Sequence, residues 1–324
     1  MILLVVLSVC LAVAVAWAYL GASPGALRPA VLVAALGLGV WIAATTEALA
    51  ALGWIGRVPF VVAWSALCGG LASVLVWRVR HHPPVEWQWP ELQPFERAFA
   101  VGLIVFAAAE AVIGLIAPPN TWDSLTYHMS RVMHWIQNGN VNLYATHILR
   151  QNHLAPWTDY ALLHTVVLGG SDRYVNLVQW AGMLGSLAAL TMIARELGAT
   201  RAAQGLAAAF AISIPMGVLQ STGTKSGHTL SLWLGCMVFF LIRLSRRPTT
   251  GNAVAVGLAL GLGMLTKATM LLFAPPFLCL WTWRRWVRGE AGDRATWCRH
   301  AAVILARLSL FAGSRAKNIS KLVF

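Results

Sequence analysis

The stretch ILLVVLSVCLAVAVAWAYL, residues 2–20, contains no charged side chain and decides the fold class of this protein. A helix needs about 20 mostly apolar residues to cross the hydrocarbon core of a bilayer, and this stretch is long enough. It lacks the basic start and the small-residue cleavage site of a secretory signal peptide. We therefore expect residues 2–20 to be retained as a membrane helix.

Similar apolar stretches recur along the chain and predict further membrane helices. They lie at residues 30–52, 58–77, 98–117, 174–194, 202–219 and 229–242. The apolar run at 253–283 is too long for one simple span, and Lys267 and the pair Pro275 and Pro276 interrupt it, which predicts a helical hairpin. The predicted fold class is all-α: a polytopic transmembrane helical bundle of about eight to nine spans.

The composition agrees with a membrane protein and excludes several other classes. Hydrophobic residues make up 58% of the 324 residues and charged residues only 11%, whereas soluble domains carry about 25% charged residues. A net charge of +13 can indicate nucleic-acid binding. Because this composition leaves little polar sequence for a nucleic-acid face, we do not expect a nucleic-acid partner. Five cysteines without a CxxC pair suggest neither a disulfide framework nor a zinc site.

The basic residues predict the orientation of the bundle. They concentrate in four loops, which the positive-inside rule places in the cytoplasm. These loops carry Arg78, Arg80 and Arg97; Arg195 and Arg201; Arg243, Arg246 and Arg247; and Arg284, Arg285, Arg288, Arg294 and Arg299. Because each span takes the chain to the other side of the membrane, this assignment places residues 118–173, the one long polar stretch, on the external side. We expect the function to reside there.

The chain divides into three parts on this basis. Residues 1–97 form N-terminal membrane helices and a cytoplasmic loop, and residues 98–283 form a membrane core that includes the external loop 118–173. Residues 284–324 form a basic cytoplasmic segment with a short apolar piece at 301–312 that cannot cross the membrane alone.

Five ionisable residues fall at one depth near the outer ends of the predicted spans: Glu47, Glu110, Asp123, Lys225 and Lys267. Ionisable groups at membrane depth are costly and usually face a cavity or one another. We therefore expect a polar cavity that opens toward the outer leaflet.

The external loop begins with a predicted surface helix. Pro118 and Pro119 end the preceding span, and Asp123 or Ser124 can cap a new helix that runs to about residue 138. Its apolar residues form one stripe, and its polar residues fall in a row on the opposite side. The polar row consists of Asp123, Tyr127, Arg131, His134 and Asn138. An amphipathic interfacial helix whose polar face only meets water would show the same pattern.

Three strings in this region carry a resemblance to a known family. They are PPNTWDSLTYHMSRVMHWIQ (118–137), HILRQNHLAPWTDYALLH (147–164) and GGSDRYVNLVQW (169–180). The chain resembles, over residues 98–276, the bacterial membrane glycosyltransferases of the GT-C superfamily. Its relatives there are the RgtA/B/C/D-like group, which is related to the protein mannosyltransferases and the aminoarabinose transferase of lipid A. The resemblance implies an enzyme in the bacterial inner membrane that moves a sugar from a polyprenyl-phosphate carrier to a glycan, lipid or protein acceptor on the outer face.

The resemblance also implies roles for individual residues. Asp123 matches the catalytic or metal-linked carboxylate of the superfamily, and a carboxylate can draw the proton from an acceptor hydroxyl. Lys267, in GLGMLTKATM, matches a lysine of the family. Cations stabilise the charge that develops on a leaving phosphate, which makes Arg131, Arg150, Lys225 and Lys267 the candidate phosphate ligands.

Further residues are expected to bind substrate. Tyr127 and His134 share the helix face of Asp123, and Trp122 can stack on a sugar ring. Many relatives carry an acidic residue near Gly227, where this chain reads QSTGTKSGH, so Asp159 is the candidate second acid. No metal-binding spacing of histidines is present, and a divalent metal ion remains one option because some superfamily members use one.

Two other functions fit the same pattern of spans. A lipid-linked sugar flippase or another transporter would also combine many spans with buried charges, but its polar groups should be accessible from both sides. A non-catalytic membrane subunit is the third option, because relatives usually continue for several more spans beyond the end of this chain.

Overall fold

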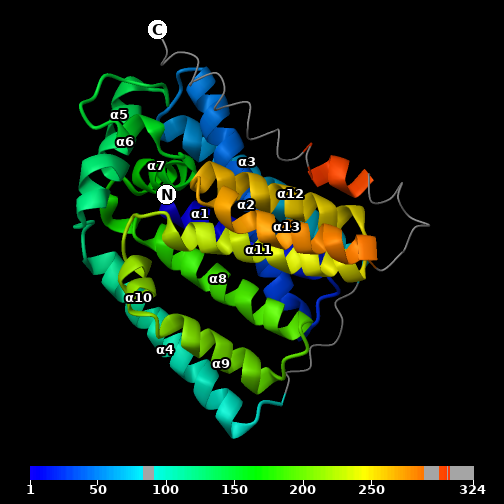
Figure 1. Cartoon of the computed structure of the whole chain (residues 1–324). Helices are drawn as coiled ribbons and strands as arrows, with labels where there is room; N and C mark the ends of the chain where they lie inside the picture. Colours follow the sequence, from blue (N-terminus) through cyan, green and yellow to red (C-terminus); the bar gives the residue numbers. More distant parts are fainter. Residues whose placement is uncertain (83–90, 288–298, 305, 307–324) are drawn as a thin grey trace.

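The computed structural model describes residues 1–82, 91–287, 299–304 and 306, and these residues form helices and connecting loops without a strand (Figure 1). The all-α prediction is therefore confirmed. Most of the predicted apolar piece at 301–312 and most of the basic segment 284–324 lie outside the described residues.

Six helices of the described chain are long and apolar enough to cross a membrane. They are α1 (Ile2–Tyr19), α2 (Leu27–Ala51), α3 (Arg57–His81), α4 (Pro94–Ile116), α8 (Leu177–Glu196) and α11 (Gly227–Arg246). They agree with six of the predicted spans. The predicted hairpin is also present, as α12 (Thr250–Thr266) and α13 (Met270–Val287).

The apolar run at 202–219 is a broken helix and not the straight span that the sequence predicted. It forms α9 (Arg201–Ile212) and α10 (Pro215–Ser221), which are bent by 75°. Pro215 lacks an amide hydrogen, and it holds Ile214 in an extended conformation (ψ 112°), so the helix cannot continue through it. With this bent pair the described residues offer up to seven spans, and α12 is a shorter apolar helix of 17 residues.

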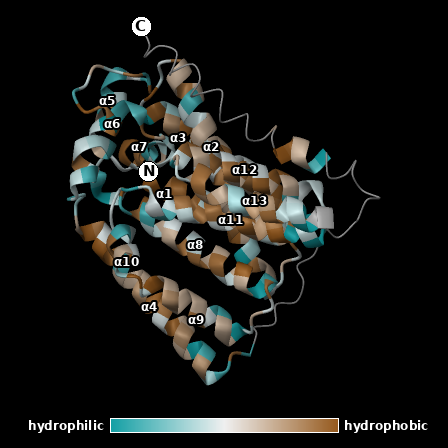
Figure 2. Cartoon of the chain, in the orientation of Figure 1, coloured by the Kyte–Doolittle hydropathy of each residue, from teal (hydrophilic) through white to brown (hydrophobic). Residues whose placement is uncertain are grey.

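The centre of the bundle is built on α11. Its buried residues, among them Trp233 and Phe239, pack with α2, α8 and α12 in one hydrophobic core. Figure 2 shows the apolar residues along the spanning helices and the hydrophilic residues toward the two ends of the bundle. This is the distribution that a bilayer requires, because only the helix ends meet water.

Short helices connect α4 to α8 and cover one end of the bundle (Figure 1). They are the π-helical turn η2 (Ser124–His128), α5 (Met129–Asn138), α6 (Arg150–His153), α7 (Trp157–Gly169) and the 3-10 turn η3 (Asp172–Tyr174). The loop before α3 joins them, since the Ile55 amide donates to the Gly139 carbonyl at 3.2 Å. We call this end of the molecule the loop end.

Contacts at the opposite end bring together the basic loops. Arg195 donates to the carbonyl of Gly25, which lies in the 3-10 turn η1 (Pro24–Ala26), at 3.1 Å. Arg201 donates to the Glu91 carbonyl, also at 3.1 Å. Arg246 forms an ion pair with Glu196 at 3.1 Å. Loops from four parts of the chain thus meet at one end, which we call the basic end.

Candidate functional site

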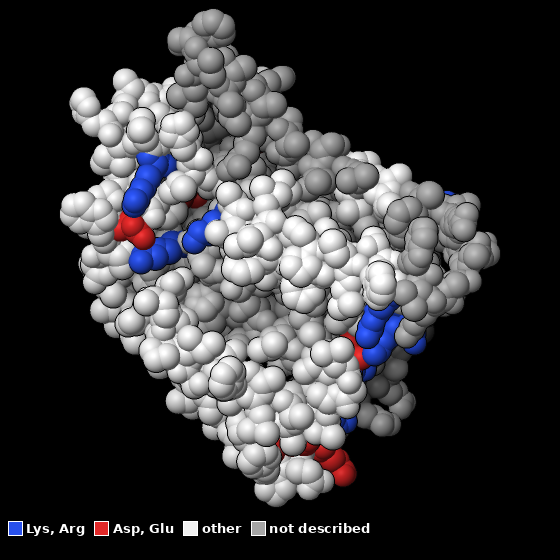
Figure 3. Space-filling view, in the orientation of Figure 1, with Lys and Arg blue, Asp and Glu red and all other residues white. Residues whose placement is uncertain are grey.

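The accessible charged pair at the loop end consists of Asp123 and Lys225. Asp123 directly precedes η2, and Lys225 lies in the loop between α10 and α11. A carboxylate oxygen of Asp123 lies 3.4 Å from the Lys225 ammonium, and their side chains are 31% and 34% exposed. Figure 3 shows acidic and basic side chains gathered at this end of the molecule, with a broad uncharged face between them and the basic end. A carboxylate and an ammonium group therefore lie side by side within reach of solvent.

Asp123 is free for this contact because another residue caps the turn. The side chain of Asp123 makes no capping hydrogen bond. Instead the hydroxyl of Thr121 accepts from the Ser124 amide at 3.2 Å and lies 2.6 Å from the Ser124 hydroxyl. The sequence prediction of Asp123 or Ser124 as the cap was wrong, and the consequence is that the Asp123 carboxylate points toward other groups.

Tyr127 is the second neighbour of Asp123. Burial raises the pKa of the Tyr127 phenol above its usual value, and the Asp123 charge together with a hydrogen bond between the two side chains raises it further. The phenol thus stays protonated and donates to the carboxylate. This contact orients the carboxylate and confirms the predicted proximity of Asp123 and Tyr127.

A second cluster of charged residues lies inside the loop end. Asp159, at the start of α7, accepts from His128 Nδ1 at 2.5 Å and from Arg131 Nη1 at 2.7 Å. The remaining guanidinium nitrogens of Arg131 donate to the carbonyls of Gln151 and Leu154. The side chains of Arg131 and Asp159 are 3% and 1% exposed.

These contacts change the roles expected for Arg131 and Asp159. Each nitrogen of the Arg131 guanidinium already donates to a protein oxygen, and Asp159 already holds two partners. Buried charges are stable only when they are paired and hydrogen-bonded, as here. Arg131 therefore ties α5 to α7 and to the end of α6 rather than presenting itself to a phosphate, and Asp159 is not an accessible second acid.

The surface helix is also embedded more deeply than its pattern predicts. Met129, Val132 and Trp135 pack against α7 in the core of the loop end, whereas Leu125 and Met133 of the predicted apolar stripe are exposed. The π-helical turn at Ser124–His128 shifts the helix register, so the expected separation into an apolar and a polar face does not hold through the whole segment.

The other predicted binding residues have separate surroundings. Trp122 is 79% exposed, and Arg150 is exposed at the start of α6. The ring of His134 lies 4.2 Å from that of Tyr144, measured between centroids. Lys267 is exposed in an extended conformation at the C-terminal cap of α12.

Of the five ionisable residues expected to share one cavity, the structure joins only Asp123 and Lys225 by a contact within the described chain. Glu110 of α4 accepts from the Ser221 hydroxyl at the end of α10. Glu47 of α2 accepts from the Tyr160 hydroxyl of α7. Each carboxylate thus joins a spanning helix to a neighbouring short helix at the loop end.

Sequence reasoning missed His128 and His164, both buried at the loop end. His128 lies three residues before Arg131, a spacing that places two side chains on one helix face, and this was the available signal. His164 accepts from the Trp64 indole at 3.0 Å, and its other ring nitrogen lies 2.9 Å from the Thr46 hydroxyl. Burial lowers the pKa of His164 well below its usual value, so it is a neutral residue that connects α7 to α2 and α3.

An apolar cavity of about 500 Å³ lies between the helices that flank the loop of Lys225. Residues of α8, α9, α10 and α11 line it, including Leu190, Ile212 and Val238. Its polar members include His228, three residues after Lys225, whose imidazole contacts the Gly217 carbonyl at 2.7 Å. The cavity is thus apolar along most of its walls, and its lining includes His228 at the start of α11.

The loop end does not fit a bound metal ion. Within residues 1–82, 91–287, 299–304 and 306, no group of three histidine, cysteine or acidic side chains could hold one. Asp123 faces an ammonium rather than a second acid, and Asp159 is occupied by Arg131 and His128.

One comparison with known proteins gives a match. Residues 154–311, just under half of the chain, match the sequence model of a family described as dolichyl-phosphate-mannose-protein mannosyltransferase. The match includes Lys225 and Lys267 and begins after Asp123. Comparisons with curated proteins and with solved structures found no match. The family match and the membrane-length helices indicate a multi-pass membrane glycosyltransferase with a lipid-linked sugar donor, which confirms the general prediction.

Proposed function

We propose that this protein is a GT-C-type glycosyltransferase of the bacterial inner membrane that acts at the loop end, on the outer face. It transfers a sugar from a polyprenyl-phosphate carrier to a hydroxyl of a glycan, lipid or protein acceptor. The observation that carries the proposal is the accessible pair of Asp123 and Lys225 where α4 ends and the loop end begins. That is the depth at which a membrane-bound carrier presents its phosphate.

In the proposed reaction Asp123 acts as the general base. As the acceptor oxygen bonds to the anomeric carbon, the bond between that carbon and the phosphate oxygen breaks. The acceptor proton passes to the Asp123 carboxylate, and the carrier leaves as polyprenyl phosphate. Tyr127 is a positioning residue, because its phenol donates to the same carboxylate and fixes its orientation.

Basic residues of the loop end are proposed to bind the carrier phosphate. Lys225 already lies beside the carboxylate, and Lys267 and Arg150 are exposed and free to approach a phosphate. Cations so placed stabilise the negative charge that grows on the leaving phosphate. Trp122 and His134, at the same end, are proposed contacts of the sugar rings.

The apolar cavity between α8, α9, α10 and α11 is the proposed position of the prenyl chain. It offers about 500 Å³ of mostly apolar space between the helices that flank the loop of Lys225. A chain lying there would keep its phosphate at the level of the Asp123 and Lys225 pair. Since this pair lies at one end of the bundle, the geometry favours transfer over transport through the bundle.

The test compares Asp123→Asn with the wild type in membrane vesicles that contain the expressed protein. The probe is radiolabelled polyprenyl-phosphate mannose, and the measurement is label transferred to the acceptor fraction. We expect a loss of about 10²–10⁴-fold, because the amide keeps the size of the side chain but is not a base. Asp172→Asn, an exposed acid of the same loop region, is the matched control and should transfer at the wild-type rate. Undiminished transfer by stable, membrane-inserted Asp123→Asn would refute the assignment.

A further inference from the structure

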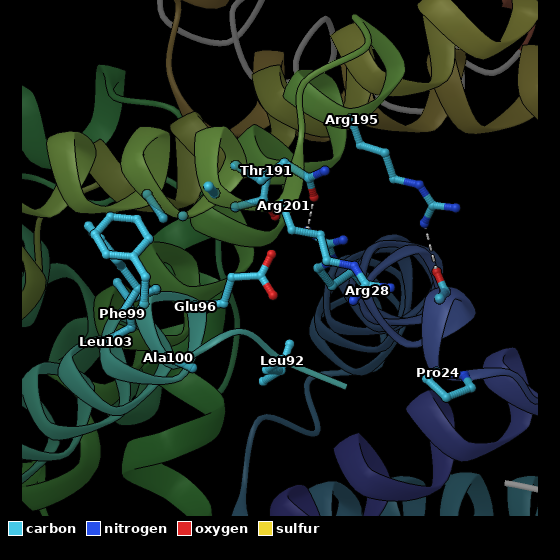
Figure 4. A pocket seen from close by; sticks show the side chains of 16 residues that line it. Pro24, Arg28, Leu92, Glu96, Phe99, Ala100, Leu103, Thr191, Arg195 and Arg201 are labelled. Atoms are coloured by element: carbon cyan, nitrogen blue, oxygen red, sulfur yellow. Dashed lines mark hydrogen bonds between the residues drawn. The ribbon is translucent and has the colours of Figure 1, made fainter. Parts of the chain in front are cut away.

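A second cavity, of about 590 Å³, lies at the basic end, and Figure 4 shows the side chains that line it. It is enclosed by the start of α2, the first turns of α4, the last turns of α8 and the beginning of α9. The proposed transfer reaction uses none of its residues. Its walls combine arginines with aromatic and aliphatic side chains.

The polar wall of this cavity is strongly basic. Arg28, Arg195 and Arg201 line it, from α2, α8 and α9. Arg28 donates to the Gln204 side chain at 2.8 Å, and Arg195 and Arg201 donate only to backbone carbonyls, each at 3.1 Å. Among the described residues, none of these guanidinium groups has a carboxylate within ion-pair distance.

The acid at this cavity does not neutralise the arginines. Glu96 lies in the wall formed by α4, and Figure 4 shows its carboxylate on the cavity side. The carboxylate accepts from the Gln93 amide at 3.1 Å as part of the helix cap, so it is engaged at the start of α4. The wall therefore carries three guanidinium groups against one carboxylate.

The opposite wall is apolar and belongs to helices that face lipid. Phe95, Phe99 and Leu103 line the cavity along one side of α4. The outer surfaces of the same helix pair expose large apolar residues, including Ile104 of α4 and Phe210 of α9. A molecule in this cavity would thus contact cations at the basic end and hydrocarbon surface toward the middle of the bundle.

We propose that this cavity binds an anionic phospholipid of the leaflet at the basic end. Its phosphate contacts Arg28, Arg195 and Arg201, and an acyl chain lies along Phe95, Phe99 and Leu103. Guanidinium groups are suited to phosphate because they present several donors in one plane. A free phosphate ion would satisfy only the basic wall, whereas a phospholipid matches both walls, and this difference favours the lipid.

The experiment measures lipid binding to the purified full-length protein in detergent micelles by native mass spectrometry. Phosphatidylglycerol is titrated, with phosphatidylcholine and inorganic phosphate titrated separately. We expect bound phosphatidylglycerol on the wild type at concentrations where phosphatidylcholine does not bind. The Arg28→Gln and Arg201→Gln variants should each bind it about tenfold more weakly, because each loses a charge-assisted contact to phosphate.

Two further variants separate the proposal from general effects of charge or folding. Arg57→Gln removes an exposed arginine at the start of α3, at the loop end, and should bind phosphatidylglycerol as the wild type does. Ala100→Trp fills the apolar side of the cavity without changing a charge and should weaken binding. Equal binding by all variants, or competition by inorganic phosphate at the same concentration as the lipid, would overturn the proposal. Because the readout is lipid binding, the result is independent of any effect on sugar transfer.

Discussion

At the scale of single residues, the loop end contains two ion pairs that differ in burial. Asp123 and Lys225 are partly exposed, whereas Arg131 and Asp159 are buried and fully engaged. Both pairs consist of a carboxylate and a cation, so their chemistry alone does not distinguish them. The distinction follows from burial, because solvent reaches the first pair and is excluded from the second.

Arg131→Met should strongly destabilise the protein. The substitution keeps much of the side-chain length but leaves the buried Asp159 without its guanidinium partner. Breaking a buried ion pair by removing one partner costs about 3–5 kcal/mol. The measurement is the thermal unfolding midpoint in detergent, with the exposed Arg173→Met as the control. Equal midpoints for wild type and Arg131→Met would show that the ion pair does not hold the loop end together.

Tyr127 should stay protonated beyond the ordinary titration range of tyrosine. Burial and the Asp123 carboxylate both raise its pKa, so the folded protein holds this proton more tightly than the unfolded chain does. The contribution to stability is thus complete below about pH 10 and is lost as the pH rises above it. The measurement is the difference between the ultraviolet titration curves of the wild type and Tyr127→Phe. This difference should show no phenolate absorbance below about pH 10. A difference transition at lower pH would contradict the contact with Asp123.

At the scale of helices, close approach of α8 to α11 sets the centre of the bundle. A Cβ atom on Gly182 of α8 would lie 2.9 Å from the Thr229 amide nitrogen and 3.0 Å from the His228 carbonyl carbon. These are backbone atoms, which cannot move aside as a flexible side chain can. The glycine therefore fixes the distance between two of the helices that line the apolar cavity of about 500 Å³.

Gly182→Ala should accordingly destabilise the protein by about 1–3 kcal/mol, because the two helices must separate to admit the methyl group. The matched control is Gly102→Ala in α4, where an added Cβ meets nothing within 4 Å. Alanine at an open helical position is favoured over glycine by about 0.5–1 kcal/mol, so the control should be neutral or slightly stabilising. Thermal unfolding of both variants in detergent tests the contrast, and similar shifts would argue against the close approach.

At the scale of the whole molecule, the two ends of the bundle differ in the segments that form them. Basic loops from distant parts of the chain meet at one end, and the segment 118–173 covers the other. On the positive-inside rule we expect the loop end on the outer face.

Single cysteines should report this orientation. In a background with the five native cysteines replaced by alanine, Asn138→Cys lies at the end of α5 and Arg247→Cys lies just after α11. Both positions are exposed. A membrane-impermeant maleimide added to intact cells with a permeable outer membrane should label only Asn138→Cys, and disrupted membranes should show both. Labelling of both positions in intact cells would contradict the proposed topology.

The sequence by itself determined that the protein is an all-α membrane bundle and where most of its helices lie. Long apolar runs leave a chain few choices in a bilayer, because every backbone polar group must be paired within its own helix. The position of Asp123 at the end of α4 followed from Pro118 and Pro119, a local effect. The 75° break before α10 was also encoded locally, in Pro215, although the sequence prediction passed over it.

Only the tertiary structure decided the partners of the charged residues. Arg131 could equally have met a phosphate, another carboxylate or water, and its contact with Asp159 joins positions 28 residues apart. Asp123 and Lys225 come from loops that approach one another only after α4, α10 and α11 have packed. The physical reason is that Coulomb attraction acts between any opposite charges, so their pairing depends on distance and burial, and packing of the whole bundle sets both.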